Sequence, residues 1–580
     1  MRKGLECEGE TVSIGFPNKG KVKIKAAFVN DERVDADGDE GYVLVKNALP
    51  GQTVRFRISK TRNGRAEGNL VSVVKKAPCE ISDICPQAGL CGGCIYQGFP
   101  YEETLKIKEA QVKDLLKDYV EGAQYDGVKP SPVETGYRNK MEYTFGDEYK
   151  DGPLTIGLHK RGSFYDLADA SCCRIADEDF GKILEYTKNF FAEKKLPFYH
   201  RMYHTGLLRH LLVRKAAKTG EILTALVTSS ECKDGHEDDR PLLSDARYEA
   251  DSLAAVYDDW KEGLCALELS GSITGIIHVV NDSAADAVKA DSVEVLYGRD
   301  YFEEELLGLK FRITPFSFFQ TNSLGAEVLY SLARTYLSGS ENGAHVFDLY
   351  SGTGTIAQIL APAARKVTGV EIVAEAVEAA KENAKLNGLT NCEFIAGDVL
   401  KVLDELTDEK PDCIVLDPPR DGVNPKALLK ILRYGVDKLV YISCKPTSLQ
   451  RDLEMITACG YEVKRWGMVD MFPFTGNIET VVLLSKLSEA KHHIEVKVDM
   501  DELDLTSAEA KATYKEIQDW VQEKYGFHVT NLNIAQVKQK HGIIERENYN
   551  KPKSENSNQP GCPEEKIKAI EDAMQHFQMI

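Results

Sequence analysis

A cysteine and a carboxylate in the second half of the chain have side chains suited to covalent catalysis. Cys444 follows the strand-like run Lys438–Ile442, and Lys445 stands next to it. A cationic neighbour favours the thiolate, which is the form of cysteine that attacks an electrophilic carbon. Glu479 stands at the start of another apolar run, where a carboxylate could remove a proton. Each residue alone also has an ordinary interpretation, because most lone cysteines are small buried hydrophobic residues and most carboxylates are merely solvated.

A glycine-rich turn upstream has the form of a cofactor-binding loop. The apolar run Val346–Leu349 leads into Gly352 and Gly354, and Ala357 follows. Glycine at such a turn lets a ligand approach the backbone closely. The spacing also satisfies the dinucleotide fingerprint G-x-G-x-x-A, with Glu371 near the distance expected for a ribose-binding acid.

Three aspartates favour S-adenosylmethionine over a nicotinamide dinucleotide at this turn. Asp348 lies in the run ahead of the turn, and Asp398 and Asp417 lie at the ends of later apolar runs. Acids beside the turn would repel a pyrophosphate but suit a cationic sulfonium. Pro418 and Pro419 follow Asp417 and predict a rigid extended turn that can hold this acid at the floor of a pocket.

A second group of cysteines has the spacing of metal ligands. Cys85, Cys91 and Cys94 are one ligand short of a tetrahedral set, and the distant pair Cys172-Cys173 could supply the fourth. Spacing alone leaves zinc and an iron–sulfur cluster nearly even. Cys79 lies six residues before Cys85, and we expect it outside the site.

The nucleophile, the base and the glycine turn all lie in a segment whose strands alternate with helices. The pattern predicts strands at His345–Phe347, Lys366–Val370, Cys392–Ile395, Cys413–Leu416 and Lys438–Ile442, with helices at Ile372–Asn387 and Pro425–Tyr434. Such alternation predicts an α/β fold with a Rossmann-like, doubly wound parallel sheet, whose ligands sit at the carboxyl ends of the strands. We therefore expect residues 301–488 to form the catalytic domain.

The first three hundred residues predict two further domains. Residues 1–76 have short alternating strands cut by turn residues, which indicates a small five-stranded, OB-like β-barrel. Its later strands carry a basic cluster, Arg55, Arg57, Lys60, Arg62 and Arg65, which fits either an RNA-binding face or a solvated strand face. Residues 77–300 carry the cysteines, a helix at Tyr101–Asp118 and a mixed α+β pattern. The acidic stretch 232–262 predicts an irregular surface excursion.

Length, charge and hydrophobicity limit the number of domains, the kinds of partner and the location that the sequence allows. The chain has 580 residues, too many for one compact module. Its formal net charge of -19 argues against a surface coated with phosphate-binding cations, so any nucleic-acid surface must be local. The sequence has no secretory signal and no apolar run of membrane-spanning length, so we expect a cytoplasmic protein. Residues 489–580 predict a helix at Ser507–Lys524, a polar linker and a last short helix, with no evident chemistry.

Taken together, the motifs resemble those of the RNA uracil-5 methyltransferases, and the 23S ribosomal RNA branch of that family is the most similar. The resemblance covers about residues 5–486. The segments that carry it, in the family's order, are Cys85-x5-Cys91-Gly92-Gly93-Cys94, Tyr137–Lys140, Ser317–Asn322, Asp348–Gly354, Asp417–Arg420, Ser443-Cys444 and Ile478–Thr480. Two positions depart from the family pattern: Asn477 stands where a histidine often occurs, and Ser351 stands where a cysteine often precedes the glycine.

The resemblance implies roles for individual residues. It implies an N-terminal TRAM barrel, with Cys444 as the nucleophile and Glu479 as the base. A 4Fe-4S cluster would be held by Cys85, Cys91, Cys94 and Cys173, with Cys172 as the alternative fourth ligand. S-adenosylmethionine would be held by Gln320, Tyr350, Glu371, Asp398 and Asp417, with Glu371 on the ribose hydroxyls and Asp398 near the adenine.

The implied reaction explains why these residue types are needed. Uracil C5 is a poor nucleophile, but a thiolate added to C6 turns the ring into an enolate with electron density at C5. That carbon can take the methyl group, after which a base removes the C5 proton and the cysteine leaves. The target base must leave its stack to meet Cys444. The resemblance thus implies formation of 5-methyluridine in 23S ribosomal RNA, with ribosomal RNA as the partner and no membrane or obligate protein partner.

Three alternatives stay open at this point. A transfer-RNA uracil-5 methyltransferase would share the chemistry but typically lacks the barrel and the cluster. An amino-group methyltransferase would use the Asp417-Pro418-Pro419 loop and have no need of Cys444, although Arg420 replaces the aromatic residue usual after the prolines. A catalytically silent iron–sulfur RNA-binding protein would keep the cysteines and the barrel only.

Overall fold

The computed structural model divides the chain into two compact units, Met1–Ala490 and Lys491–Ile580. The residues that it describes are 3–29, 32–35, 41–62, 65–82, 84–150, 152–163, 165–233, 250–283, 290–337, 343–406, 410–487, 514–525, 527, 529–541 and 563–576. The predicted polar linker, 548–559, lies outside these residues.

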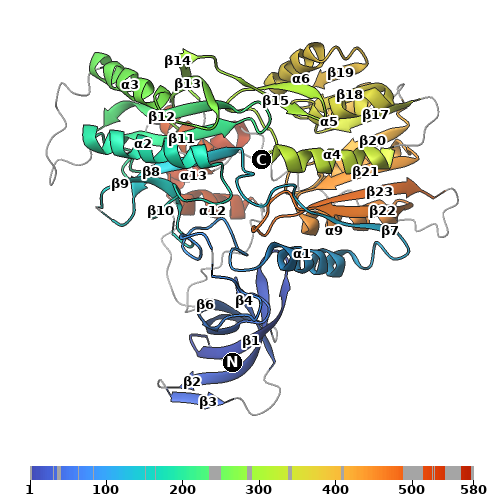
Figure 1. The fold of residues 1–580 in the computed structure, drawn as a ribbon, viewed down its shortest axis with the longest axis horizontal. Coiled ribbons are helices and arrows are strands. Elements are labelled where there is room, and N and C mark those ends of the chain that lie inside the picture. The colour runs from blue at the N-terminus through green and yellow to red at the C-terminus, as the bar shows by residue number, and fades with distance from the viewer. Residues whose placement is uncertain are drawn as a thin grey trace. The chain divides into compact units, whose positions relative to one another are not determined.

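The N-terminal strands form a closed ring with one strand added. The strands are β1 (Glu6–Gly15), β2 (Lys19–Val29), β3 (Glu32–Asp35), β4 (Tyr42–Lys46), β5 (Thr53–Arg62) and β6 (Arg65–Lys75). Their order is β1-β5-β6-β4-β2-β3, and β1 also pairs with β2, so five strands close on themselves and β3 extends β2 (Figure 1). Alternation places Val22, Val43, Val54 and Phe56 in the core of the ring.

A seven-stranded sheet forms the middle of the first unit. Its order is β10-β9-β8-β11-β12-β13-β14. The strands are β8 (Lys140–Asp147), β9 (Leu154–His159), β10 (Leu167–Asp169), β11 (Gly206–Lys215), β12 (Glu221–Lys233), β13 (Ser272–Val280) and β14 (Ser292–Gly298), and helices α2 (Glu178–Lys194) and α3 (Ala250–Cys265) accompany them. The prediction of an irregular excursion at 232–262 is wrong for α3, because Trp260 is fully buried and donates from Nε1 to Thr187 Oγ1 at 3.2 Å.

The predicted parallel sheet is present as part of an eight-stranded sheet with the order β19-β18-β17-β20-β21-β23-β22-β7. Its strands are β17 (Ala344–Leu349), β18 (Ala364–Glu371), β19 (Cys392–Ala396), β20 (Cys413–Leu416), β21 (Lys438–Ser443), β22 (Tyr461–Val469), β23 (Glu479–Lys486) and β7 (Gln124–Lys129). The strands from β17 to β21 run parallel, whereas β23 runs antiparallel to β21 and to β22.

Helices and a small hairpin accompany this sheet, and α4 packs against β21, β22 and β23 (Figure 1). The helices are α4 (Ser323–Leu337), α5 (Thr355–Leu360), α6 (Ala374–Leu386), α7 (Val399–Glu405), α8 (Pro425–Arg433) and α9 (Pro446–Ala458), with a short helical turn at Ala361–Ala363. The hairpin pairs β15 (Phe302–Leu306) with β16 (Leu309–Ile313).

The segment 101–129 packs with the parallel sheet, although its place in the sequence assigns it to the central domain. Strand β7 pairs with β22 in parallel, and the Tyr125 and Trp466 rings lie 4.4 Å apart between centroids. Helix α1 (Tyr101–Leu116) buries Val112 and Leu116 in the same core as Trp466. The expected boundary at 300 therefore does not separate the two domains, because an early segment completes the edge of the later sheet.

The second unit contains helices α11 (Tyr514–Tyr525), α12 (Asn531–Lys540) and α13 (Glu564–His576) around a core of its own. Ile517, Val521, Ile534 and Ile570 are fully buried in it. Residues 507–513 of the predicted helix lie outside the described residues, and α12 is a helix that the sequence interpretation did not predict. None of the helices in the described part of the chain is long and apolar enough to cross a membrane.

Candidate active site

Six of the predicted site residues follow one edge of the parallel sheet. In the spatial order of the strands β19, β18, β17, β20, β21 and β23, the residues at this edge are Asp398, Glu371, Tyr350, Asp417, Cys444 and Glu479. The first five lie at or just beyond the carboxyl ends of parallel strands. Glu479 lies at the same edge because β23 runs in the opposite direction and begins there. The sheet topology therefore brings together residues that span 129 positions of the sequence, from Tyr350 to Glu479.

Cys444 and Glu479 occupy neighbouring positions of two paired strands. Ser443 pairs with Thr480 in the ladder between β21 and β23, and each site residue lies one position beyond this pair. Burial raises the pKa of Glu479 to about 8, and the negative charge of Asp417 acts in the same direction. Burial raises the pKa of Cys444 to about 11, with further contributions from the charges of Glu479 and Asp417. The carboxyl is thus close enough to the thiol for its charge to act on the thiol.

Buried acids surround the middle of this edge. Asp348 is fully buried in β17, and burial together with the charge of Asp417 raises its pKa to about 8. Burial also raises the pKa of Asp417 to about 7. The Tyr330 hydroxyl lies near these acids and near the Gln320 side chain. A cation bound here would favour the ionised forms of the acids, so the pocket chemistry suits a sulfonium.

The glycine turn has left-handed backbone geometry and is held by Glu371. Gly352 and Gly354 have φ values of +54° and +72°, which lie in the left-handed region that glycine adopts without strain. The Glu371 carboxylate accepts hydrogen bonds from the backbone N–H groups of Gly352 and Val373, each at 3.0 Å. A carboxylate has about four acceptor sites, so Glu371 retains capacity for ribose hydroxyls while it holds the turn.

Asp348 anchors the helix that follows the turn. Its Oδ2 atom accepts from the Ala357 backbone N–H at 2.9 Å. Oδ1 of the same carboxyl is buried and has no hydrogen-bond partner among the described residues. The aspartate therefore fixes the turn through one oxygen and leaves the other without a partner among the described residues.

Two other predicted cofactor residues, Asp398 and Tyr350, have different local roles. Asp398 is the N-cap of α7 and accepts from the Leu400 N–H at 2.7 Å. Tyr350 has a φ of +69°, which is rare for a non-glycine residue, and burial raises its pKa to about 12. The charge of Asp398 is the next contributor to that shift, which places Asp398 near the Tyr350 ring.

Arg420 and Asn477 are site residues whose roles the sequence interpretation missed. Arg420 Nη2 donates to Asn477 Oδ1 at 2.7 Å, so the loop after β20 is linked to the segment before β23. The positive charge of Arg420 lowers the pKa values of both Cys444 and Glu479 against the raising effect of burial. The available signal was the arginine directly after Asp417-Pro418-Pro419, at the same strand end as a predicted site acid.

The structure gathers the four predicted cluster cysteines. Burial raises the pKa of Cys94 to about 12, and the charges of Cys173, Cys91 and Cys85 raise it further, which indicates that these thiols are near one another. The Gln97 side chain bridges them, accepting from the Cys85 N–H at 3.4 Å and donating to Cys94 Sγ at 3.5 Å.

The gathered thiols do not form a single-ion metal site. Within the described ranges, no three His, Cys, Asp or Glu side chains are arranged to hold one metal ion. The all-thiol donor set suits iron–sulfur chemistry, in which each cysteine binds a different iron atom. The cluster therefore stays a prediction.

The basic cluster of the barrel is partly neutralised. Arg55 and Arg57 form ion pairs with Glu6 at 3.2 Å and 2.7 Å. Arg55 also lies over the Phe28 ring, 3.9 Å from its centroid. Lys60, Arg62 and Arg65 lie toward the end of the β5–β6 hairpin. The part of the cluster suited to phosphate contact is thus the hairpin end.

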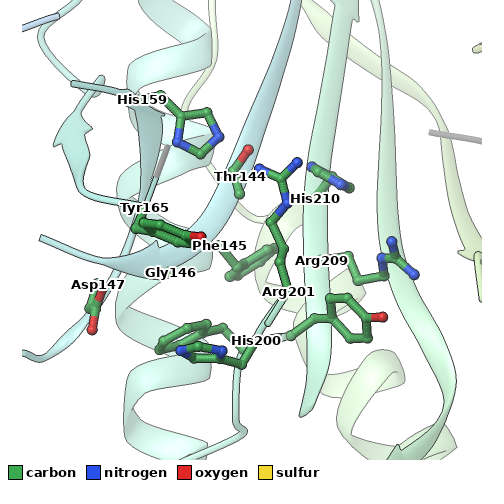
Figure 2. A pocket seen from close by; sticks show the side chains of 12 residues that line it. Thr144, Phe145, Gly146, Asp147, His159, Tyr165, His200, Arg201, Arg209 and His210 are labelled. Carbon is green, nitrogen blue, oxygen red and sulfur yellow. The ribbon is translucent and has the colours of Figure 1, made fainter. Parts of the chain in front are cut away.

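A pocket in the central sheet is separate from the predicted site residues (Figure 2). Its lining comes from β8, β9, β11, the loop between β9 and β10 and the loop before β11, and includes Tyr165, Tyr199, His200, Arg201 and Arg209. The Arg209 guanidinium lies 4.1 Å from the centroid of the Tyr199 ring and donates to two backbone carbonyls. Such arginines and aromatic rings can contact phosphates and stack on bases.

Comparison with known sequences points to a single family. A family model described as tRNA (Uracil-5-)-methyltransferase matches residues 258–487. An uncharacterized RNA methyltransferase of Clostridium acetobutylicum is 45% identical over 487 residues, which are 84% of this chain and 99% of that protein. Another, from Caldanaerobacter subterraneus subsp. tengcongensis, is 48% identical over 443 residues, which are 76% of this chain and 93% of that protein.

Comparison with solved structures supports the fold. The crystal structure of Pyrococcus abyssi tRNA (uracil-54, C5)-methyltransferase in complex with S-adenosyl-L-homocysteine superposes with a TM-score of 0.59 at 23% sequence identity. The match covers 82% of this chain and 100% of that chain. The predicted mixed α/β methyltransferase fold is therefore confirmed.

Proposed function

The chain belongs to the RNA uracil-5-methyltransferase family, and we propose that it transfers a methyl group from S-adenosylmethionine to C5 of uracil through a covalent bond between Cys444 and C6. The adjacency of Cys444 and Glu479 at the edge of the sheet carries this proposal. A nucleophile and a base at neighbouring positions can act on C6 and C5 of one pyrimidine ring, because those ring carbons are bonded to each other.

The proposed reaction conserves the thiolate and releases one proton. Cys444 adds to C6, and the resulting enolate attacks the sulfonium methyl group, which leaves S-adenosylhomocysteine. Glu479 then takes the proton from C5, the double bond between C5 and C6 re-forms, and the bond between C6 and sulfur breaks. The raised pKa of Glu479, about 8, makes this carboxylate a stronger base than an exposed one.

The residues of the glycine turn would hold the methyl donor. Glu371 would accept from the ribose hydroxyls, with Tyr350 and Asp398 near the adenine, and Gln320 and Asp417 would complete the site. The positive sulfonium would favour the ionised forms of the buried acids around Asp417 and would be attracted to them. This attraction would be lost once the methyl group has left. That difference favours release of the neutral thioether product.

We assign ribosomal RNA, specifically 23S RNA, as the substrate, in line with the N-terminal ring of strands and the cysteine group. In this assignment the ring is a TRAM barrel, and Cys85, Cys91, Cys94 and Cys173 hold a 4Fe-4S cluster whose role is structural or RNA-positioning. Cys172 is the alternative fourth ligand. The likeness to a tRNA methyltransferase structure keeps transfer RNA as the second candidate substrate.

RNA containing 5-fluorouridine tests the chemistry. A base can remove a proton from C5 but cannot remove a fluorine in the same way. The covalent complex between Cys444 and the methylated base should therefore persist in the wild type and be absent in Cys444→Ala. Methyl transfer that survives Cys444→Ala would instead support the amino-group alternative. Absence of transfer to every RNA would support a binding protein without catalysis.

Parallel reactions with 23S fragments and transfer-RNA transcripts test the substrate. The position of 5-methyluridine in each product would be mapped by mass spectrometry of nuclease digests. Methylation of the 23S fragments alone is the expected result, and methylation of the transcripts alone would overturn the ribosomal assignment.

A further inference from the structure

The loop between β22 and β23, residues 470–478, delivers Glu479 to the site and is held by its backbone carbonyls. The donors come from four other segments of the chain. Lys108 Nζ donates to Phe472 O at 3.1 Å and to Asn477 O at 2.9 Å. Asn322 Nδ2 donates to Met471 O at 2.9 Å, and the Tyr137 hydroxyl donates to Pro473 O at 3.0 Å. The backbone N–H groups of Ile95 and Tyr96 both donate to Phe474 O, at 2.9 Å each. The path of this loop is therefore set by contacts distant in sequence.

Lys108 is the centre of this arrangement. Its side chain is fully buried, and Nζ forms an ion pair with the equally buried Asp470 at 2.7 Å. The same ammonium group reaches both ends of the loop, because it also donates to Phe472 O and Asn477 O. Burying a charged pair costs solvation energy that an apolar pair of similar size would not cost. This pair therefore stabilises the fold little compared with apolar residues in the same place. Its three donated hydrogen bonds instead specify one geometry of the loop.

The loop is also strained where the cysteine segment meets it. Phe474 has a φ of +63°, a left-handed conformation that is costly for an aromatic residue. The two N–H groups that hold its carbonyl belong to Ile95 and Tyr96, which directly follow Cys94. The Tyr137 hydroxyl holds the preceding carbonyl. The cysteine segment and the loop before Glu479 are thus joined by hydrogen bonds.

We propose that Lys108 is a positioning residue that holds the loop 470–478 so that Glu479 reaches the C5 proton, and that residues 94–96 and Tyr137 complete the same clamp. This inference rests on the proposed function of Glu479. It gives the cysteine segment a role in catalysis through geometry, because displacement of Cys94 would move the amides that hold Phe474. A displacement of about 1 Å at a catalytic group can slow a step by about 100-fold.

The two halves of the reaction separate this role from general damage to the fold. Adduct formation on 5-fluorouridine RNA needs Cys444 and the methyl donor but no proton removal. Release of methylated product from ordinary uridine RNA needs Glu479 as well. A positioning defect at Glu479 therefore slows release and leaves the rate of adduct formation nearly unchanged.

The double variant Lys108→Met/Asp470→Leu removes both buried charges together, because removal of one alone would leave the other unpaired. We expect single-turnover release to slow by about 10-fold to 100-fold, with adduct formation within about twofold of wild type. Tyr137→Phe removes one hydrogen bond with little change of shape, and we expect a smaller slowing of release. The matched control is Tyr143→Phe, since the buried Tyr143 hydroxyl has no hydrogen-bond partner among the described residues.

Amide hydrogen exchange of a peptide spanning residues 92–99 gives a readout independent of turnover. In the double variant this peptide should exchange faster than in wild type, because the loop that accepts from Ile95 and Tyr96 is loosened. Exchange at the wild-type rate would contradict the proposed link between the loop 470–478 and the cysteine segment.

Two other results would overturn the proposal. One is release at the wild-type rate in the double variant, and the other is adduct formation slowed as much as release. If the double variant does not fold, Tyr137→Phe decides alone. Slower release than in Tyr143→Phe supports the clamp, and release at the same rate as in Tyr143→Phe contradicts it. Methyl transfer by Cys444→Ala would contradict the proposed reaction itself. That outcome is distinguishable from failure of the clamp because it is measured on a different variant.

Discussion

The Cys444 thiol and the Glu479 carboxyl lie one residue beyond the paired residues Ser443 and Thr480, on adjacent antiparallel strands. The charge of Glu479 raises the pKa of Cys444, and burial raises the pKa of both groups. Two predictions follow from this relationship, and two others concern Asp348 and the glycine turn.

The reactivity of Cys444 should rise steeply with pH. Burial and the nearby charges of Glu479 and Asp417 raise its pKa to about 11, so the thiolate fraction grows about tenfold per pH unit from about pH 7 to pH 10. Alkylation by iodoacetamide, followed at the Cys444 peptide by mass spectrometry, should show this slope. Glu479→Gln should speed alkylation at about pH 9 because it removes the negative charge that raises the pKa of Cys444 most. A rate independent of pH over this range would show that the thiol is already ionised.

Release of product should depend on ionisation of Glu479. Because its pKa is raised to about 8, the basic form is a minor species below that pH, and the release rate should rise about tenfold per unit up to about pH 8 and then level off. Glu479→Gln should slow release by about 100-fold to 10,000-fold and accumulate the covalent complex with ordinary uridine RNA. The amount of complex is measured on denaturing gels after a single turnover. A variant that turns over at the wild-type rate would assign the proton to another base.

Asp348→Asn should change how stability depends on pH. Burial raises the pKa of Asp348 to about 8, so between about pH 4 and pH 8 the folded chain keeps a proton that the unfolded chain has lost. The free energy of unfolding therefore falls as pH rises through this window, by at most about 1.4 kcal/mol per pH unit from this group. Thermal unfolding at about pH 6 and pH 8 should show a smaller loss for Asp348→Asn than for wild type. The exposed Asp35→Asn is the matched control, and an equal loss in all three proteins would contradict the prediction.

The two glycines of the turn should tolerate alanine unequally. A Cβ at Gly354 would meet Phe394 Cε1 at 2.6 Å and Ala380 Cβ at 2.8 Å, and its φ of +72° adds strain. We expect Gly354→Ala to lower the free energy of unfolding by about 3 kcal/mol. At Gly352 the added Cβ would meet no atom within 4 Å among the described residues beyond its chain neighbours, so Gly352→Ala should cost only the conformational strain, about 1 kcal/mol. Urea denaturation of both variants measures the difference, and equal losses would refute the steric argument.

Much of the candidate site at this edge was predictable because of a simple property of parallel sheets. When strands alternate with helices, the carboxyl ends of the parallel strands meet at one edge, so residues after successive apolar runs become neighbours. Asp398, Asp417 and Cys444 were found in this way, whereas Tyr350 was assigned through the family resemblance. Glu479 was found through the family motif, since its strand runs in the opposite direction and its start gives no local signal of the shared edge.

Other features were missed because their signals are weak along the chain. Helix α3 lies in an acidic stretch, and only the packing of Trp260 into the central core shows why it is ordered. Lys108 was overlooked although it stands among the buried residues of α1, between Thr104 and Val112. A charged residue in the buried stripe of an amphipathic helix is a usable signal, because such a residue requires a partner.

The sequence by itself determined the type of chemistry, the family and the parallel sheet, because motifs and hydrophobic periodicity are properties of short segments. Only the tertiary structure decided which distant groups meet. Lys108 and Asp470 are 362 residues apart, and Arg420 and Asn477 are 57 apart, yet each pair is joined by a hydrogen bond. Such pairs depend on how α1, β7 and the strand-end loops dock on the sheet, and no local pattern of residues encodes that docking.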